Sequence, residues 1–262
     1  MSIWRVIGLE TRDAFENMAI DEAVSEMVAA QDSPPTIRFY RWKPSAVSIG
    51  YFQSLHDEID LKRCAEESVD CVRRRTGGGA VYHDYEGELT YSVIAPESIF
   101  PKGITDSYHV VCGWIMDGLS RLGIETCFKP VNDIVIGDNV TCNDGILQAG
   151  KKISGNAQTR RGGVLLQHGT ILYKVDVKKM FSVLTVGQDK IADKMIAAVE
   201  ERVTAVNRID PSIAYDDLYH AMAEAFTENK KWTPGEWTLA EMMRAQELAE
   251  RRYLTKDWLE MR

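Results

Sequence analysis

The stretch from Arg73 to Asp84, which reads RRRTGGGAVYHD, constrains this chain more than any other. A glycine triplet loses more backbone entropy on folding than other tripeptides, so a folded protein keeps one where the backbone needs positive φ or a ligand approaches it closely. Successive amides in such a turn can form an anion-binding nest, and adjacent arginines offer forked donors that suit phosphate. The stretch therefore predicts a loop that binds a phosphate or a carboxylate. The alternative is a tight hairpin flanked by solvated arginines.

The composition favours one large globular domain, which we take as residues 1–262. The net charge of −8 argues against nucleic acid as the main partner, because the chain has no overall basic field. The N-terminus lacks the apolar run of a signal peptide, and no stretch is suited to span a membrane. An odd number of cysteines without CxxC spacing suggests neither a disulfide framework nor a zinc site. Together these features predict a cytoplasmic protein.

Periodicity and turn signals predict alternating strands and helices. The first helix is expected to leave Asn17, Asp21 and Glu22 solvated, and the strand at 3–9 to lie at a sheet edge. The polar segment 137–145 is expected to form a mobile loop. The expected sheet is mixed or largely antiparallel, with helices on one side. Strands are expected at 3–9, 36–42, 46–53, 69–74, 88–95, 124–128, 133–136, 148–154 and 163–175, and helices at 14–30, 57–67, 105–122, 179–184, 189–200, 211–229 and 239–252.

A second informative segment runs from Gly150 to Leu172 and reads GKKISGNAQTRRGGVLLQHGTIL. Lys151 and Lys152 stand just before a Ser-Gly-Asn turn. Taken alone, such lysines are more often solvated than catalytic. His168, between Gln and Gly, is by itself more typical of a hydrogen-bonded core residue than of a ligand or a base.

The two segments together resemble the lipoate–protein ligase A family of the biotin/lipoate ligase superfamily. The blocks NMAIDEA, SIGYFQ, VNDIVI and ERVTAVNRI also look like that family and occur in the same order, so the resemblance runs from about residue 3 to residue 230. It implies an α+β fold with mixed, largely antiparallel β-sheets flanked by helices, related to class II aminoacyl-tRNA synthetases and biotin ligases.

The resemblance also implies an activity. Lipoate and ATP, with Mg²⁺, would give lipoyl-AMP, and a lysine of a lipoyl-carrier domain would then attack the adenylate. The expected protein partners are lipoyl domains of 2-oxoacid dehydrogenase E2 or the glycine-cleavage H protein.

By the same resemblance, Lys152 is the expected catalytic residue, because the matching family lysine contacts both the lipoyl carbonyl oxygen and the α-phosphate. A compact ammonium can serve two oxygens at once. Asp133 and Asp138 are the nearest candidate ligands for Mg²⁺, and a structural role for Asp133 is the alternative. The expected ATP or adenylate contacts are Arg75, Gly77, Gly78, Gly79, Ala80, Val81, Tyr82, His83 and Lys152. The expected lipoyl contacts are Arg75, Gly79, His83, Lys152, His168 and Gly169.

Two departures from the family leave alternatives open. Full-length bacterial ligases of this family carry a C-terminal accessory domain that this chain lacks, so we expect a separate accessory polypeptide to support adenylation. The segment AQTRRGGVLLQHG also resembles relatives that move octanoyl or lipoyl groups between carriers through a cysteine thiol. Where those relatives place the cysteine, this chain has Asn132 and Asp133; Cys127 and Cys142 are the nearby thiols. A non-catalytic protein that keeps the fold is the third alternative.

Overall fold

Two β-sheets and the helices around them form the chain, for which the computed structural model describes residues 2–137, 150–185 and 189–262. In the large sheet the strand order is β11-β1-β2-β6-β10-β9-β8-β7, and in the small sheet it is β4-β3-β5. Its strands are β1 (Trp4–Arg12), β2 (Thr36–Trp42), β3 (Ala46–Ile49), β4 (Asp70–Arg73), β5 (Val81–His83), β6 (Glu88–Pro96), β7 (Cys127–Lys129), β8 (Asp133–Ile136), β9 (Lys151–Arg161), β10 (Val164–Leu172) and β11 (Trp232–Pro234).

Most neighbouring strands run antiparallel, which confirms the predicted mixed and largely antiparallel sheets. The parallel pairs are β1 with β2, β1 with β11, and β3 with β4. The prediction that the first strand lies at a sheet edge is wrong, because β11 adds to its outer side. The loop expected at 137–145 falls, apart from Gly137, outside the described residues.

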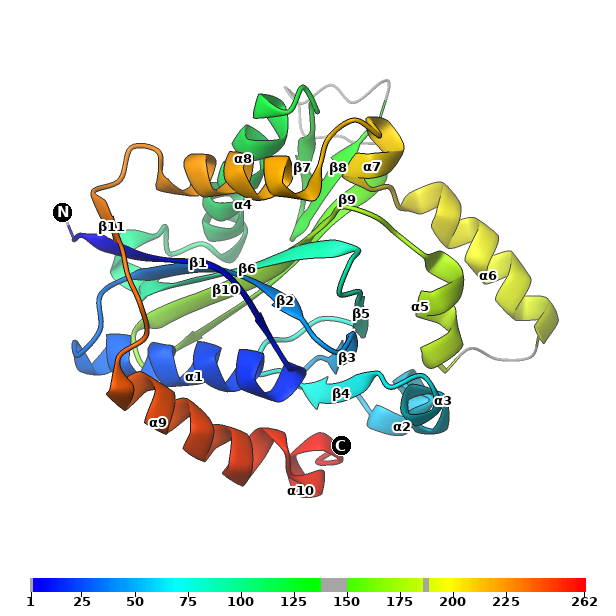
Figure 1. Cartoon of the computed structure of the whole chain (residues 1–262), viewed down its shortest axis with the longest axis horizontal. Helices are drawn as coiled ribbons and strands as arrows, with labels where there is room; N and C mark the ends of the chain where they lie inside the picture. The colour runs from blue at the N-terminus through cyan, green and yellow to red at the C-terminus, as the bar shows by residue number, and fades with distance from the viewer. Residues whose placement is uncertain (1, 138–149, 186–188) are drawn as a thin grey trace.

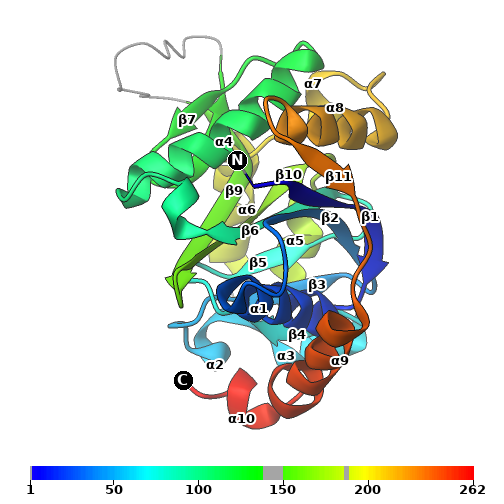
Figure 2. The ribbon, with the colours of Figure 1, turned by 90° about the vertical axis from the view of Figure 1, so that its left-hand side faces the viewer.

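Helices cover both faces of the large sheet rather than one, as Figures 1 and 2 show. On one face lie α4 and α8, and on the other lie α1 and α9. The described helices are α1 (Ala14–Ala30), α2 (Leu55–Glu58), α3 (Leu61–Glu66), η1 (Glu97–Ile99), α4 (Ile104–Arg121), α5 (Val177–Val183), α6 (Asp189–Arg202), α7 (Val206–Ile209), α8 (Tyr215–Thr227), α9 (Leu239–Leu248), η2 (Ala249–Tyr253) and α10 (Lys256–Leu259).

The alternation of side chains along β2 explains this two-sided cover. Ile37 and Phe39 point to the cluster beneath α4 and α8, whereas Tyr40 and Trp42 point to the cluster beneath α1. Every one of these four side chains is almost fully buried. A strand that is buried on both faces needs other elements packed against both of them. The sequence pattern of β2 alone did not predict the second layer of helices.

Helix α1 begins at a side-chain cap, since Asp13 accepts a hydrogen bond from the backbone N–H of Glu16 at 2.8 Å. The prediction that Asn17, Asp21 and Glu22 are solvated is wrong: all three are buried. The helix lies between the large sheet and the C-terminal segment, so its polar residues pair with buried partners instead of water. Among the described residues, no helix is long and apolar enough to cross a membrane.

Candidate functional site

A cavity of about 310 Å³ lies between the large sheet and the small sheet, and the glycine loop after β4 closes part of it. Strands β2, β6, β9 and β10 supply one wall, and β3 and β5 supply another. A third wall comes from the helical region after β10, with Met180 on α5, Val199 on α6, and Val203 just beyond α6. The volume is in the range of small-molecule sites, so the cavity is the candidate active site.

The glycine loop reaches the cavity through Gly78 and Gly79 but not through Gly77. Gly78 has a φ of +98°, which L side chains rarely adopt. A Cβ on Gly50 would lie only 2.1 Å from the carbonyl oxygen of Gly78, so the neighbouring strand end also needs a glycine to admit the loop. The prediction that the triplet meets a need for positive φ is therefore correct, and the close approach seen here is one of the chain to itself.

The three arginines before the glycines are committed to the protein, which corrects the prediction that they supply free donors to an anion. Arg73 donates to the carbonyl oxygens of Gln53 at 2.6 Å and Leu259 at 2.7 Å, among others. Arg74 lines the cavity, but it donates to the loop carbonyls of Gly77 and Gly79. Burial lowers the pKa of Arg74 to about 10.

Arg75 was the arginine predicted to contact both nucleotide and lipoyl group, and it does not line the cavity. Its guanidinium pairs with the buried carboxylate of Glu22. Arg252 and the Tyr253 hydroxyl, both from the C-terminal segment, bind the same carboxylate. Arg75 therefore joins α1 to the C-terminal segment, and it shares the Glu22 carboxylate with Arg252.

Lys152 lies in the cavity, as predicted, and its Nζ is 2.6 Å from Asp133 Oδ1. Both side chains are partly exposed, at 41% and 30%. The lysine folds back over Gly155, where a Cβ would lie 2.6 Å from Nζ, so the glycine of the Ser-Gly-Asn turn makes room for the ammonium. Asp133 thus pairs with Lys152 and orients it, a role that the sequence did not predict.

His83 and His168 also line the cavity, and each is held at both ring nitrogens. His83 lies between Glu88 Oε1 at 2.6 Å and Ser48 Oγ at 2.8 Å, and its ring stacks on Trp42. His168 lies between Asp21 Oδ2 at 3.0 Å and Thr76 Oγ1 at 2.7 Å. Burial lowers the pKa of His168, against the opposing effect of Asp21.

The remaining predicted cavity residues are Ala80, Val81, Tyr82 and Gly169, and all four line it. Gly169 sits so close to the next strand that a Cβ would lie 2.1 Å from the Asn156 side-chain oxygen. The sequence did not predict several further residues that line the cavity. The helical periodicity of residues 189–200 was an available signal for Val199, and the Ser-Gly-Asn turn was one for Asn156. The residues that were not predicted are Met18, Tyr40, Trp42, Ser48, Arg74, Glu88, Thr90, Asn132, Asn156, Met180, Val199 and Val203.

The residues present do not fit the predicted Mg²⁺ and nucleotide triphosphate. The Asp133 carboxylate is paired with Lys152, and Asp138 lies outside the described residues. Within the described part of the chain, no three His, Cys, Asp or Glu side chains are grouped so that they could hold a metal ion. The side chains of Arg73 and Arg74 donate to groups of the protein, and Arg75 pairs with Glu22 outside the cavity lining.

The cysteines of the described residues lie away from the cavity lining. Cys64, Cys71 and Cys112 are free thiols, and burial raises the pKa of Cys112 to about 12, so it is no ready thiolate. Cys127 opens β7 and is disulfide-bonded, contrary to the expectation that the cysteines form no disulfide. Cys142 lies outside the described residues.

Comparison with known proteins places this geometry among lipoyl-group enzymes. Residues 13–227 match the model of the lipoyl protein ligase A/B catalytic domain. The chain is 36% identical to octanoyltransferase LipM of Staphylococcus aureus, over 98% of both chains. It is 34% identical to octanoyltransferase LipM of Kyrpidia tusciae, again over 98% of both.

Solved structures agree on the fold. The bi-partite lipoate protein ligase of Thermoplasma acidophilum, described with its E2 lipoyl domain, has a TM-score of 0.85 and 29% identity over 99% of this chain and 97% of that one. A lipoate-protein ligase A bound with ATP has a TM-score of 0.78 and 28% identity over 98% of both chains. These likenesses confirm the predicted fold and superfamily.

The same comparisons correct the predicted activity. The relatives that combine more than 30% identity with a match along nearly their whole length are octanoyltransferases, so the prediction of ATP-dependent lipoate activation is wrong for this chain. The alternative of acyl transfer between carriers is the better supported reading. The accessory polypeptide was inferred only to support adenylation, and that reason falls with the adenylation step.

Proposed function

This chain belongs to the lipoyl protein ligase A/B catalytic domain family, and we propose that it transfers an octanoyl group from a thioester on one carrier protein to a lysine of a lipoyl domain. The thioester is already activated, so neither ATP nor Mg²⁺ has a step in this reaction. The observation that carries the proposal is that the three motif arginines bind other parts of the protein, while Lys152, one of two lysines that line the cavity, is held in place there by Asp133.

That charge distribution fits acyl transfer better than adenylation. Adenylation brings a carboxylate against a triphosphate, and this requires several preorganised positive groups. Acyl transfer from a thioester develops one negative charge, on the carbonyl oxygen of the tetrahedral intermediate. One ammonium, oriented by Asp133 at 2.6 Å, can stabilise that oxygen.

The overall step balances without a further reactant. The acceptor amine forms a C–N bond to the octanoyl carbonyl carbon, and the C–S bond to the donor carrier breaks. The nitrogen gives up one proton, and the departing thiolate takes one. The alkyl chain would lie against the cavity residues Val81, Tyr82, His83, His168 and Gly169. Of these, His83, His168 and Gly169 are among the predicted lipoyl contacts.

The test supplies the purified chain with an octanoyl thioester of a carrier protein and a lipoyl domain of a 2-oxoacid dehydrogenase E2, without ATP. We expect octanoylation of the lipoyl domain, read by intact mass. A parallel reaction contains free octanoate or lipoate with MgATP. Modification only in that second reaction would contradict the proposal. The glycine-cleavage H protein replaces the E2 domain in a second series, to identify the acceptor.

Lys152→Ala should lower kcat by about 10²–10³, the usual effect of losing one oxyanion donor. Lys151→Ala is the matched control, because Lys151 is adjacent on β9 and exposed. Equal activity of the two variants would contradict the role of Lys152. Incubation with the donor alone, followed by mass analysis of the wild type and of Cys127→Ser and Cys142→Ser, decides whether the octanoyl group passes through a cysteine.

A further inference from the structure

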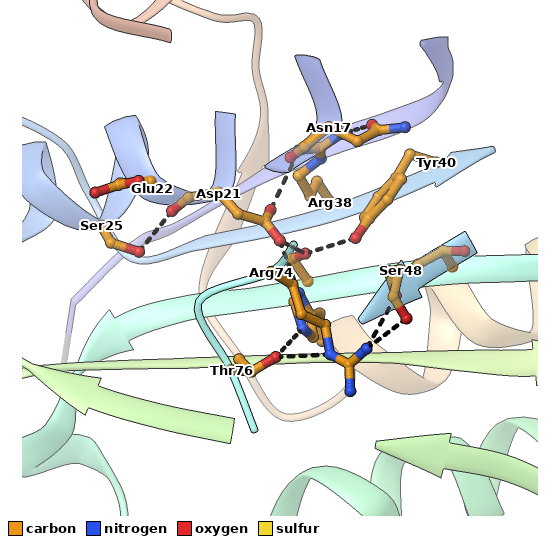
Figure 3. Close-up of polar contacts among 12 residues, drawn as sticks. Asn17, Asp21, Glu22, Ser25, Arg38, Tyr40, Ser48, Arg74 and Thr76 are labelled. Carbon is orange, nitrogen blue, oxygen red and sulfur yellow. Dashed lines mark hydrogen bonds and ion pairs between the residues drawn. The ribbon is translucent and has the colours of Figure 1, made fainter. Parts of the chain in front are cut away.

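Arg74 lines the cavity, and two chains of hydrogen bonds begin at its guanidinium. It is 5% exposed, and its five N–H groups match five acceptors. Nε donates to Thr76 Oγ1 at 3.2 Å, and Nη1 donates to the backbone oxygen and to Oγ of Ser48, both at 3.0 Å. Nη2 donates to the carbonyl oxygens of Gly77 at 2.8 Å and Gly79 at 2.7 Å. Figure 3 shows the guanidinium between Ser48 and Thr76.

From each of the two hydroxyls a chain of hydrogen bonds continues to a buried carboxylate. The first runs from Ser48 Oγ to His83 Nε2, and from His83 Nδ1 to Glu88 Oε1. Thr90 also donates to that carboxylate oxygen, at 2.9 Å. Ser48, His83 and Glu88 are each no more than 5% exposed, so water does not compete for these bonds.

The second chain has the same order of groups on other parts of the fold, with Thr76 before the glycines, His168 on β10 and Asp21 on α1. It runs from Thr76 Oγ1 to His168 Nε2, and from His168 Nδ1 to Asp21 Oδ2. Arg38 and Ser92 donate to the same carboxylate, at 3.2 Å and 2.8 Å. Each chain therefore has a guanidinium at one end and an acceptor-only carboxylate at the other.

The proton positions follow from the two ends. A hydroxyl has two lone pairs and one proton. Each of these hydroxyls accepts a bond from Arg74, and the histidine Nε2 is the acceptor that the described residues place within reach of its proton. Both Nε2 atoms must then be unprotonated acceptors. Each Nδ1 must carry the proton that it donates to its carboxylate. An Nε2–H tautomer would leave an unprotonated Nδ1 facing a carboxylate, and an imidazolium would leave the buried hydroxyl proton without an acceptor among the described residues.

We propose that Arg74 is a positioning residue that, through Ser48 and Thr76, fixes both cavity histidines as neutral Nδ1–H tautomers. All four ring nitrogens are then occupied by protein partners. The rings are left to offer carbon surface to the cavity, which suits an alkyl chain and disfavours a polar or charged group. This last step rests on the proposed octanoyl transfer, whereas the tautomers follow from the hydrogen bonds alone.

The tautomers can be measured directly. Two-bond ¹⁵N–¹H correlation spectra of the histidine-labelled chain at neutral pH distinguish the two neutral tautomers and the imidazolium. The five histidines are assigned by replacing each in turn by glutamine. We expect His83 and His168 to show the Nδ1–H pattern. An Nε2–H tautomer or an imidazolium at either position would overturn the proposal.

The two chains can be perturbed separately. Ser48→Ala should change the tautomer signature of His83 and leave that of His168, and Thr76→Val should do the reverse. Arg74→Lys keeps the charge but loses the fork, so both signatures should change. Arg160→Lys, at a half-buried arginine on β9 that takes no part in either chain, is the matched control and should change neither. If Arg74→Lys does not fold, the two hydroxyl variants decide; unchanged spectra in both would overturn the proposal.

Activity gives a second readout, which a general loss of structure would not mimic. Ser48→Ala should raise the KM for an octanoyl donor roughly tenfold, with a smaller effect on an acetyl donor, because only the longer chain needs the ring surfaces. An equal rise for both donors would contradict the link to the alkyl chain. If the wild type transfers no acyl group, the proposed function fails, while the spectra still test the tautomers.

Discussion

Replacing Asp21 by asparagine tests the most consequential difference between sequence and structure, because the sequence suggested that this residue is solvated. Its carboxylate is 2% exposed and accepts bonds from Arg38, Ser92 and His168. Arg38 is itself 0% exposed. Asp21→Asn keeps the shape, removes the charge that faces the buried guanidinium, and points an N–H₂ group at groups that are already donors.

The expected cost follows from that geometry. Removing one partner of a buried ion pair typically destabilises a protein by 3–5 kcal/mol. Arg38 retains two acceptors on Asn17, the backbone oxygen at 3.2 Å and the side-chain oxygen at 2.5 Å. We therefore expect the lower end of that range, about 3 kcal/mol. This is a large share of the 5–15 kcal/mol that stabilises a typical protein.

Urea unfolding followed by circular dichroism measures the change. With an m-value of about 2–3 kcal/mol/M, the midpoint should fall by roughly 1 M. Asp32→Asn is the control, because Asp32 follows the same helix and is exposed, and its change should stay within about 0.5 kcal/mol. Equal midpoints for the two variants would refute the buried ion pair.

Two further predictions concern other buried contacts. Gly169→Ala should lower the free energy of unfolding by about 2–4 kcal/mol, because the new Cβ would displace the Asn156 side chain from its hydrogen bond with Tyr91. A urea midpoint equal to that of the wild type would contradict the tight contact. Burial alone would raise the pKa of Glu241, but hydrogen bonds from Arg5 and other donors outweigh it and lower the pKa to about 2. This carboxylate therefore stabilises the fold above pH 4.5, and the stability is lost as the pH falls toward 2. Glu241→Gln should reduce the dependence of the unfolding free energy on pH in that window. A curve for the variant that runs parallel to that of the wild type would refute the assignment.

Local patterns predicted most elements, because a strand or helix is set largely by neighbouring residues. The helix at 14–30 and the strand at 36–42 have the predicted bounds. Contacts between segments that are distant in the sequence were not predictable in this way. Strand β11 joins β1 from more than two hundred residues away, and it removed the first strand from the sheet edge. The partners of the buried Glu22, Arg252 and Tyr253, come from the same distant C-terminal segment.

The candidate site shows the same division. The resemblance placed Lys152, His83, His168 and most of the glycine loop in one cavity, and the structure brings them together. It could not say what else each side chain would contact. His168 was correctly suspected to be a hydrogen-bonded core histidine, and it is also a cavity wall, because β10 turns that face toward the glycine loop.

The arginine triplet illustrates why a motif can point to the right site and the wrong chemistry. Arginines beside glycines fit phosphate, and that inference assumes that their donors are free. Here backbone carbonyls and one carboxylate take those donors, since Arg74 binds the loop itself and Arg75 binds Glu22. The triplet therefore builds the loop and anchors the C-terminal segment instead of recruiting an anion. In such a site Lys152, held by Asp133, provides one positioned ammonium, and one positioned ammonium is what an oxyanion from a thioester requires.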